Sequence, residues 1–508
     1  MKYYITHNTA PSVKLDQIPE LSYAEFYAEL DEKLSEEHLH IGHYFALPCK
    51  GEYLRMICLL LNDLTGEVMI TSYRVGYYDE EELPSLTARH PEVHPFEREI
   101  TEHHGIRFAS MPWNKPLRFP FDRFDRQSSM ENYPFYTMEG ESLHEVNVGP
   151  IHAGIIEPGA FRFICNGERV LHLEIALGYQ HRGVEQEFVA TTNRLRQSLL
   201  AESIAGDSAV AHATAFAEAL EKASAKGFTP SKELQIERLI ALELERMAMQ
   251  IADTGALCMD IAYQLGQVAC EALRTVVINT TQTWCGNRFG KGLIRPFGTN
   301  FPLNGEKAEM IRRNITEVEH RYREVREDIL TSPSILARFE QCGRVAHEQM
   351  ASIGGVGQAA RASGVARDIR KSHPWGFWAE ETLRHKVCTC ESGDVMARLT
   401  IRLEEVIQSA AYILELLKIH PLSGEDTAPD FKAALQPEHL SFGLVEGWRG
   451  ESLQVVVTNP EGEVAACRVK DPSLHNWLAL ALAVRGEGIS DFPICNKSFN
   501  LSYCGHDL

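Results

Sequence analysis

The sequence lacks the closely spaced cysteine pairs from which most thiolate metal sites are built. Its 508 residues contain twelve cysteines but no C-x-x-C, and the closest pair is Cys388-Thr389-Cys390. Iron–sulfur clusters and zinc sites usually draw on closely spaced pairs. Scattered cysteines usually act as small buried apolar residues. The absence of a disulfide framework indicates a reducing cytoplasm.

Long apolar runs are also missing. Met56–Leu61 and Trp477–Val484 are among the longest, and both are far shorter than the roughly 20 residues that span a bilayer. The N-terminal stretch MKYYITHNTAPS contains no apolar core of the kind that signal peptides have. We therefore expect neither a membrane-spanning segment nor a signal peptide.

Positive charge is scarce. The sequence contains fifty Lys and Arg residues and seventy Asp and Glu residues, which gives a formal net charge of −20. A protein that binds nucleic acid needs a basic stripe to neutralise phosphates, so we expect no nucleic-acid partner. The charge also disfavours direct docking on anionic lipid, although a partner protein can hold such a chain at a membrane. The length predicts two or more domains.

Residues 1–125 predict a small α/β module. Apolar residues recur at helical spacing over Tyr23–Leu34. Two strand-like runs, Tyr53–Asn62 and Glu67–Tyr77, flank a hairpin-type turn. A short helix is expected within His90–Phe108, before a glycine.

The connection to the rest of the chain predicts an extended segment. Met111–Tyr136 is rich in Pro, Arg and Phe and has no periodicity, so we expect it to wrap a neighbour and place a linker at residues 126–148. Before it, the carboxylates Glu97, Glu99 and Glu102 predict a solvated or interface face of the short helix.

Residues 149–508 predict a large, mainly helical domain with peripheral β hairpins, so the fold class is α+β. Asn166-Gly167 is a strong hairpin signal between two strand-like runs. Further β character is expected in residues 441–469. The long helical patterns lie at Lys232–Tyr263, Glu306–Ile329, Gly393–Ile419 and Ser473–Val484.

The stretch Glu202–Leu220 predicts a loop that leads into a buried helix. Gly206-Asp207-Ser208 interrupts the chain before Ala, Leu and Glu recur at helical spacing. Asp207 or Ser208 is expected either to cap the helix or to act in a closed cavity, where a carboxylate titrates unusually. His212 lies four residues after Ser208 on the same helix face, as a core histidine or as a site residue.

Several motifs occur in a fixed order along the large domain. They are Gly149-Pro150-Ile151-His152, Gly178–Glu185 (GYQHRGVE), Gly357–Gly364 (GQAARASG), Asp368-Ile369-Arg370, His373-Pro374-Trp375, and Gly393-Asp394 with Arg398 and Arg402. By these motifs residues 149–508 resemble the large subunit of membrane-bound, energy-converting nickel–iron hydrogenases of the formate hydrogenlyase type. They equally resemble the quinone-site subunit of respiratory complex I. Residues 90–106 resemble the signature of the neighbouring complex I subunit, which formate hydrogenlyase fuses to its large subunit.

The resemblance fails at the metal ligands. In the hydrogenases two C-x-x-C pairs hold nickel and iron, and the matching positions here are Ala205, Ser208, Ser502 and Gly505. Thiolates are strong, soft ligands for these metals, whereas Ala and Gly supply no ligand and Ser is a poor substitute. The resemblance therefore implies that this chain binds no metal, and it argues against an active nickel–iron hydrogenase.

The resemblance to complex I implies a cavity for a quinone head group in place of the metal. His152 matches the histidine that approaches the quinone, and a histidine changes charge near physiological pH. The tyrosine on the other side of that pocket has no clear match in Glu202–Ala213. The catalytic candidates are His152, Asp207 and His212, and the substrate-binding candidates are His152, Glu157, Ser208, Arg361 and Ser502.

Two hypotheses for the function follow from this resemblance. In the first, the chain is held by partner subunits on the cytoplasmic face of the cell membrane, in an oxidoreductase complex that translocates ions. Its partners would be a small iron–sulfur subunit, a ferredoxin-like iron–sulfur subunit, and membrane-anchor and antiporter-like subunits. The 4Fe-4S clusters would lie in the partners, and electrons would reduce a quinone or another small acceptor. In the second, the chain is a structural scaffold without a substrate, and a collapsed apolar pocket would favour it.

Overall fold

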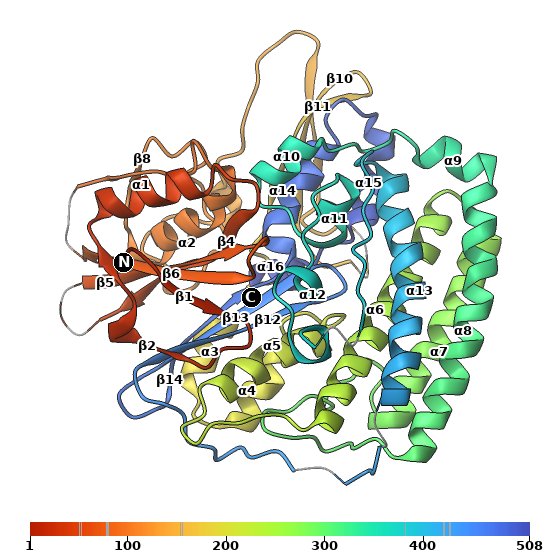
Figure 1. Cartoon of the computed structure of the whole chain (residues 1–508). Coiled ribbons are helices and arrows are strands. Elements are labelled where there is room, and N and C mark those ends of the chain that lie inside the picture. Colours follow the sequence, from red (N-terminus) through yellow and green to blue (C-terminus); the bar gives the residue numbers. More distant parts are fainter. Residues whose placement is uncertain are drawn as a thin grey trace.

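The structure is a computed structural model, and it describes residues 1–49, 51, 53–77, 81–152, 154, 156–380, 383–419, 422–425 and 428–508. It confirms the α+β fold class, with several small sheets and a large helical part (Figure 1). No helix in these ranges combines the length and the apolar content needed to cross a membrane.

The N-terminal module is a mixed sheet covered by two helices on one face. The strand order is β1-β6-β5-β4, and the short β3 pairs with β6 in parallel. The helices pack on this sheet through Phe26, Leu30 and Phe96. The elements are β1 (Tyr4–His7), β3 (Glu20–Leu21), α1 (Tyr23–Lys33), β4 (Leu39–Pro48), β5 (Tyr53–Asn62), β6 (Glu67–Gly76) and α2 (His94–His104).

A second sheet covers the other face of the module. It has the order β14-β13-β12-β2, and its Leu444 and Val455 share an apolar cluster with Ile57 and Leu59 of β5. Because β5 is buried on both faces, its sequence is a continuous apolar run rather than an alternating one. The strands are β2 (Val13–Lys14), β12 (His439–Glu446), β13 (Glu451–Thr458) and β14 (Val464–Lys470).

Four long helices form the core of the large domain and lie side by side on the right of Figure 1. They are α6 (Lys232–Asp260), α7 (Gln264–Cys285), α8 (Gly305–Thr331) and α13 (Val395–Ile419). The helices α6, α8 and α13 confirm the helical patterns of the sequence. The helix α5 (Ala209–Lys222) lies between this bundle and the strands β12 and β13.

The remaining elements are short. A three-stranded antiparallel sheet consists of β11 (Arg169–Ala176), β10 (Ala160–Asn166) and β9 (Leu143–Val148), and it confirms the hairpin at Asn166-Gly167. The short helices are α3 (Val184–Ala190), α4 (Arg194–Ala201), α9 (Pro333–Phe339), α10 (His347–Ser352), α11 (Gly357–Ala362), α12 (Ile369–Ser372), α14 (Ser473–Ala483), α15 (Phe492–Phe499) and α16 (Tyr503–Asp507). The other elements are β7 (Leu83–Pro84), β8 (Phe108–Ala109) and the 3-10 turns Leu15–Gln17, Pro91–Val93, Met130–Asn132, Gly376–Trp378 and Ile489–Asp491.

Of the two alternatives predicted for the carboxylate face of α2, solvated or interface, the structure shows the interface. Glu97, Glu99 and Glu102 are all buried, because their carboxylates bind other segments of this chain. Glu97 accepts hydrogen bonds from residues 85–87, and Glu102 accepts them from the backbone N–H groups of residues 117–119. Glu99 forms an ion pair with Arg118. The face is therefore an interface within the chain, and it holds the irregular segment that follows β8.

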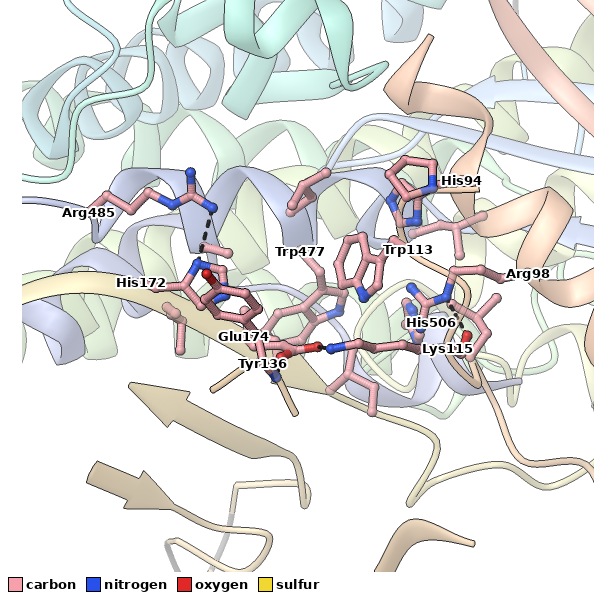
Figure 2. A pocket seen from close by; sticks show the side chains of 18 of the residues that line it. His94, Arg98, Trp113, Lys115, Tyr136, His172, Glu174, Trp477, Arg485 and His506 are labelled. Carbon is pink, nitrogen blue, oxygen red and sulfur yellow. Dashed lines mark hydrogen bonds and ion pairs between the residues drawn. The ribbon is translucent and has the colours of Figure 1, made fainter. Parts of the chain in front are cut away.

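That irregular segment also borders a cavity of about 470 Å³ between the N-terminal module and the large domain (Figure 2). The walls come from α2, β11, α14 and the C-terminal helix α16.

Candidate functional site

The four positions that the resemblance aligns with hydrogenase ligands lie in two short segments. Ala205 and Ser208 precede α5, whereas Ser502 and Gly505 lie at the start of α16. All four are buried. Ser502 caps its helix, because its hydroxyl accepts a hydrogen bond from the backbone N–H of Gly505 at 2.9 Å.

Arg182 ties the two loops together. Its guanidinium donates to the carbonyls of Ser203 at 2.6 Å and Ile204 at 2.9 Å in the first loop. It also donates to the carbonyl of Cys504 in the second loop at 3.4 Å. The motif GYQHRGVE thus holds the surroundings of the former ligand positions together.

An ion pair lies beside these loops. Arg449, in the turn between β12 and β13, donates to both carboxylate oxygens of Asp207 at 2.7 and 2.6 Å. It also donates to Ser208 Oγ at 3.3 Å and to the carbonyl of Asn500 at 2.7 Å. The Arg449 side chain is 4% exposed and that of Asp207 is 36% exposed. A bidentate pair of this kind is both strong and geometrically specific.

His212 is fully buried, and its partner is Asp471, the residue that follows β14. Its Nε2 lies 2.9 Å from Asp471 Oδ2, and its Nδ1 has no hydrogen-bond partner. Burial tends to raise the pKa of Asp471, but the hydrogen bond from His212 and the charge of Arg449 hold it below the ordinary value. Asp471 also lies against Gly505, where a Cβ atom would be 2.6 Å from its carboxylate. A cysteine at position 505 has no room in this arrangement.

Ser208 does not cap α5. It occupies the N-cap position but makes no capping hydrogen bond, so the capping interpretation of this serine is wrong. Glu245 of α6 takes that role instead, because its carboxylate accepts from the backbone N–H of Val210 at 2.7 Å and of Ala211 at 3.1 Å. Its burial raises the pKa of Glu245 to about 8. A cap supplied from another helix leaves no local sequence signal.

The raised pKa of Glu245 predicts a pH-dependent stability. The folded state holds its proton to about pH 8, whereas the unfolded chain releases it near pH 4.5. The folded state therefore binds more protons in this window, and stability falls as pH rises, by up to about 1.4 kcal/mol per pH unit. Urea denaturation at pH 6 and pH 8 should show a smaller loss for Glu245→Gln than for the unmodified chain. Equal losses in the two proteins would contradict this assignment.

His152 and Glu157 meet the C-terminal tail. His152 Nε2 lies 3.4 Å from the hydroxyl of Tyr503, and Glu157 accepts from the backbone N–H of Cys504 at 3.3 Å. The His152 ring also contacts Phe161 edge-on, with centroids 5.5 Å apart. Partial burial lowers the pKa of His152 below its ordinary value, so its imidazole is neutral at pH 7.

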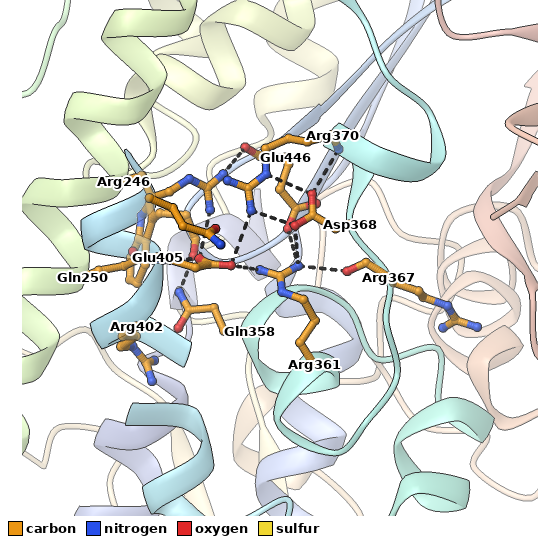
Figure 3. Close-up of polar contacts among 12 residues, drawn as sticks. Arg246, Gln250, Gln358, Arg361, Arg367, Asp368, Arg370, Arg402, Glu405 and Glu446 are labelled. Carbon is orange, nitrogen blue, oxygen red and sulfur yellow. Dashed lines mark hydrogen bonds and ion pairs between the residues drawn. The ribbon is translucent and has the colours of Figure 1, made fainter. Parts of the chain in front are cut away.

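Arg361 lies in a different place, inside a cluster of buried charges (Figure 3). Its side chain is 0% exposed, and its guanidinium lies 2.7 Å from Glu405, 2.8 Å from Glu446 and 3.6 Å from Asp368. It also donates to the carbonyl of Arg367. Protein carboxylates thus surround Arg361. It does not belong to the loops that carry Ser208 and Ser502.

Sequence reasoning missed three residues of the site. Tyr503 follows Ser502 directly in the sequence, and this neighbourhood was the one signal that could have indicated Tyr503. Arg449 and Asp471 bind residues that are 242 and 259 positions away in the sequence. No spacing rule detects contacts of that range.

The donor set does not fit a thiolate-bound nickel–iron centre. Within the described ranges, no group of three or more His, Cys, Asp or Glu side chains is arranged to hold a metal ion. Asp207 and His212, the nearest alternative donors, are already bound to Arg449 and Asp471.

The fold and the two loops resemble those of a large subunit of the hydrogenase and complex I class, without the ligating thiolates. Residues 260–507, just under half of the chain, match the family described as the respiratory-chain NADH dehydrogenase, 49 Kd subunit. The curated relatives include subunits of both hydrogenases and NADH-quinone oxidoreductases.

Comparison with curated relatives covers most of the chain. Formate hydrogenlyase subunit 5 of Escherichia coli is 27% identical over 443 residues, which are 83% of this chain and 76% of the relative. The C/D subunit of NADH-quinone oxidoreductase from Phocaeicola vulgatus is 25% identical over 440 residues, which are 79% of this chain and 82% of the relative.

A solved structure has the same fold. It is a chain from the membrane-bound sulfane sulfur reductase, an archaeal respiratory membrane complex, with a TM-score of 0.66 and 21% identity. The match covers 73% of this chain and 100% of that chain.

Proposed function

We propose that this chain is the metal-free large subunit of a membrane-attached oxidoreductase complex. In this proposal a quinone, or another small acceptor, binds beside His152 and Tyr503. The observation that carries it is the architecture around Ala205, Ser208, Ser502 and Gly505, which is kept without thiolates and stays polar. Asp207, 36% exposed, makes the neighbourhood neither apolar nor fully closed, which favours a binding site over a collapsed scaffold.

His152 and Tyr503 suit proton delivery to a quinone. Reduction of a quinone to a quinol takes two electrons and two protons, one for each carbonyl oxygen. Burial raises the pKa of the Tyr503 hydroxyl above its ordinary value, so this hydroxyl keeps its proton and donates a hydrogen bond. A neutral His152 at 3.4 Å accepts and returns protons from solvent. The second proton comes from water at the exposed side.

The electrons come from a partner subunit in this proposal. A small iron–sulfur subunit and a ferredoxin-like iron–sulfur subunit would carry 4Fe-4S clusters, and membrane-anchor and antiporter-like subunits would hold the complex at the cytoplasmic face. The names of the relatives support such an assembly, because they are subunits of larger enzymes. Coupling to ion translocation belongs to the same proposal.

Substitution of the histidine–tyrosine pair tests the proposal. In the purified complex, His152→Gln and Tyr503→Phe should each lower the rate of quinone reduction at least about tenfold, because a positioned acid contributes that much or more. A short-chain quinone and a reduced viologen donor give the rate. His144→Gln is the matched control, since His144 is exposed on β9, the strand that precedes the loop of His152.

The alternative function, a purely structural scaffold, predicts a different result. If both variants assemble normally and keep the full rate of quinone reduction, the proposed acceptor site is wrong and the scaffold alternative holds.

A further inference from the structure

The cavity between the N-terminal module and the large domain is built from three distant parts of the chain. His94 and Arg98 come from α2, residues 171–177 line it from β11, and Leu474 to Ala481 line it from α14. Its volume of about 470 Å³ suits a small organic molecule. Figure 2 shows the side chains that surround this space.

Basic side chains outnumber acidic ones in the lining. Arg98, Lys115 and Arg485 face one carboxylate, Glu174, and Lys115 already forms an ion pair with it. The chain as a whole carries a net charge of −20, so a basic cavity is unusual for this protein. The two arginines remain without a compensating carboxylate at ion-pair distance in the described parts of the chain.

Arg98 is a buried cation. Its side chain is 6% exposed, and its guanidinium donates to the carbonyls of Lys115 at 2.7 Å and Pro116 at 2.5 Å. It also lies over the ring of Trp113, 4.6 Å from the centroid. Carbonyl dipoles and an aromatic face stabilise a buried charge less than an anion does.

His94 lies at the same end of the cavity and has unused hydrogen-bonding capacity (Figure 2). It is 5% exposed, and neither ring nitrogen has a partner. Its ring stacks on Trp113 with centroids 4.7 Å apart, which fixes its orientation. Buried polar groups in proteins almost always have partners, so the imidazole of His94, whose ring borders the cavity, keeps two hydrogen-bonding atoms unused.

The rest of the lining is mainly apolar, with Tyr136, His172 and His506 as its further polar members. Leu171, Leu173 and Ile175 of β11 face Leu474 and Leu478 of α14. Such walls exclude water and favour a hydrocarbon body.

We propose that this cavity binds an organic carboxylate with an apolar body, the carboxylate lying between Arg98 and His94. The apolar body lies against the leucines of β11 and α14, and Arg485 closes the other end beside His172, at 3.4 Å. Neither His152 nor Tyr503 lines this cavity, and binding of a carboxylate is measured without quinone reduction, so the proposal is tested independently of the proposed function.

Titration calorimetry on the full-length chain tests the proposal with paired ligands. We expect 2-naphthoate to bind with one-to-one stoichiometry and 2-naphthalenemethanol, which lacks the charge, to bind at least about tenfold more weakly. Laurate distinguishes an acyl chain from a ring system, and binding of either anion supports the class. Absence of saturable binding of both anions up to about 1 mM would overturn the proposal.

A matched pair of variants locates the carboxylate. His94→Phe keeps the stacked ring and removes only the ring nitrogens, so the fold is retained, and it should weaken naphthoate binding about tenfold. The same variant should leave the affinity for the alcohol unchanged. His144→Phe, on the exposed edge of β9, should change neither affinity. Equal naphthoate affinities for His94→Phe and the unmodified chain would contradict the assigned position.

Discussion

Replacing Arg361 by methionine should lower the free energy of unfolding by about 3–5 kcal/mol. The side chain is 0% exposed, and it neutralises Glu405, Glu446 and Asp368 at distances between 2.7 and 3.6 Å. Methionine fills much of the volume but leaves these carboxylates short of a cation in a region that water does not reach. Urea denaturation of the purified chain measures the change.

The geometry of the cluster explains why the effect is large. Glu405 accepts from Arg361 and also from Arg246 and Gln250. Burial opposes its charged form, but the nearby arginines hold the pKa of Glu405 at about 2. Removal of one arginine therefore affects several groups that act together. The cluster joins α6, α11, α13 and β12, so its loss should also loosen the bundle against the sheet.

Arg326→Met is the control for this prediction. Arg326 forms an ion pair with Glu404 between α8 and α13, but the two side chains are 29% and 38% exposed. Exposed pairs of this kind contribute less than about 1 kcal/mol. A loss of similar size for Arg361→Met and Arg326→Met would contradict the structural role of the buried cluster.

Asp207→Asn should destabilise the protein more than Arg449→Met, although both variants break the same ion pair. Loss of the Asp207 charge leaves Arg449, 4% exposed, as a buried cation without its hydrogen-bonded anion, which costs about 3 kcal/mol. Loss of Arg449 leaves Asp207, 36% exposed, which water can solvate, so we expect a cost of about 1–2 kcal/mol. Denaturation of both single variants in parallel gives the comparison.

The double variant separates the ion pair from simple packing. Asp207→Asn combined with Arg449→Met removes the unpaired charge, so it should be more stable than Asp207→Asn alone. If the double variant is the least stable of the three, the pair does not act as described, and packing of Arg449 on Trp448 dominates instead.

Local patterns predicted much of the fold. The helices α1, α6, α8 and α13 and the hairpin β10–β11 follow from periodicity and turn residues, which act over a few positions. The ordered motifs identified the family before any geometry was known. The sequence left the carboxylate face of α2 open between solvent and an interface, because only the fold reveals that these carboxylates bind the segments before and after the helix.

The site was predicted less completely, for a physical reason. The positions of Ala205, Ser208, Ser502 and Gly505 followed from the motif order, and their lack of thiolates followed from the residue types. The side chains around these positions could not be predicted, because Arg449 and Asp471 lie next to strands far along the sequence. The same holds for the cavity, where His94 and Leu474 are 380 positions apart.

Elemental analysis of the purified complex tests the central claim most directly. The claim is that this chain keeps the architecture of a nickel–iron large subunit while its ligand positions, Ala205, Ser208, Ser502 and Gly505, bind no metal. The account predicts nickel far below one atom per chain, with iron accounted for by clusters in partner subunits. Nickel at about one atom per chain would contradict it.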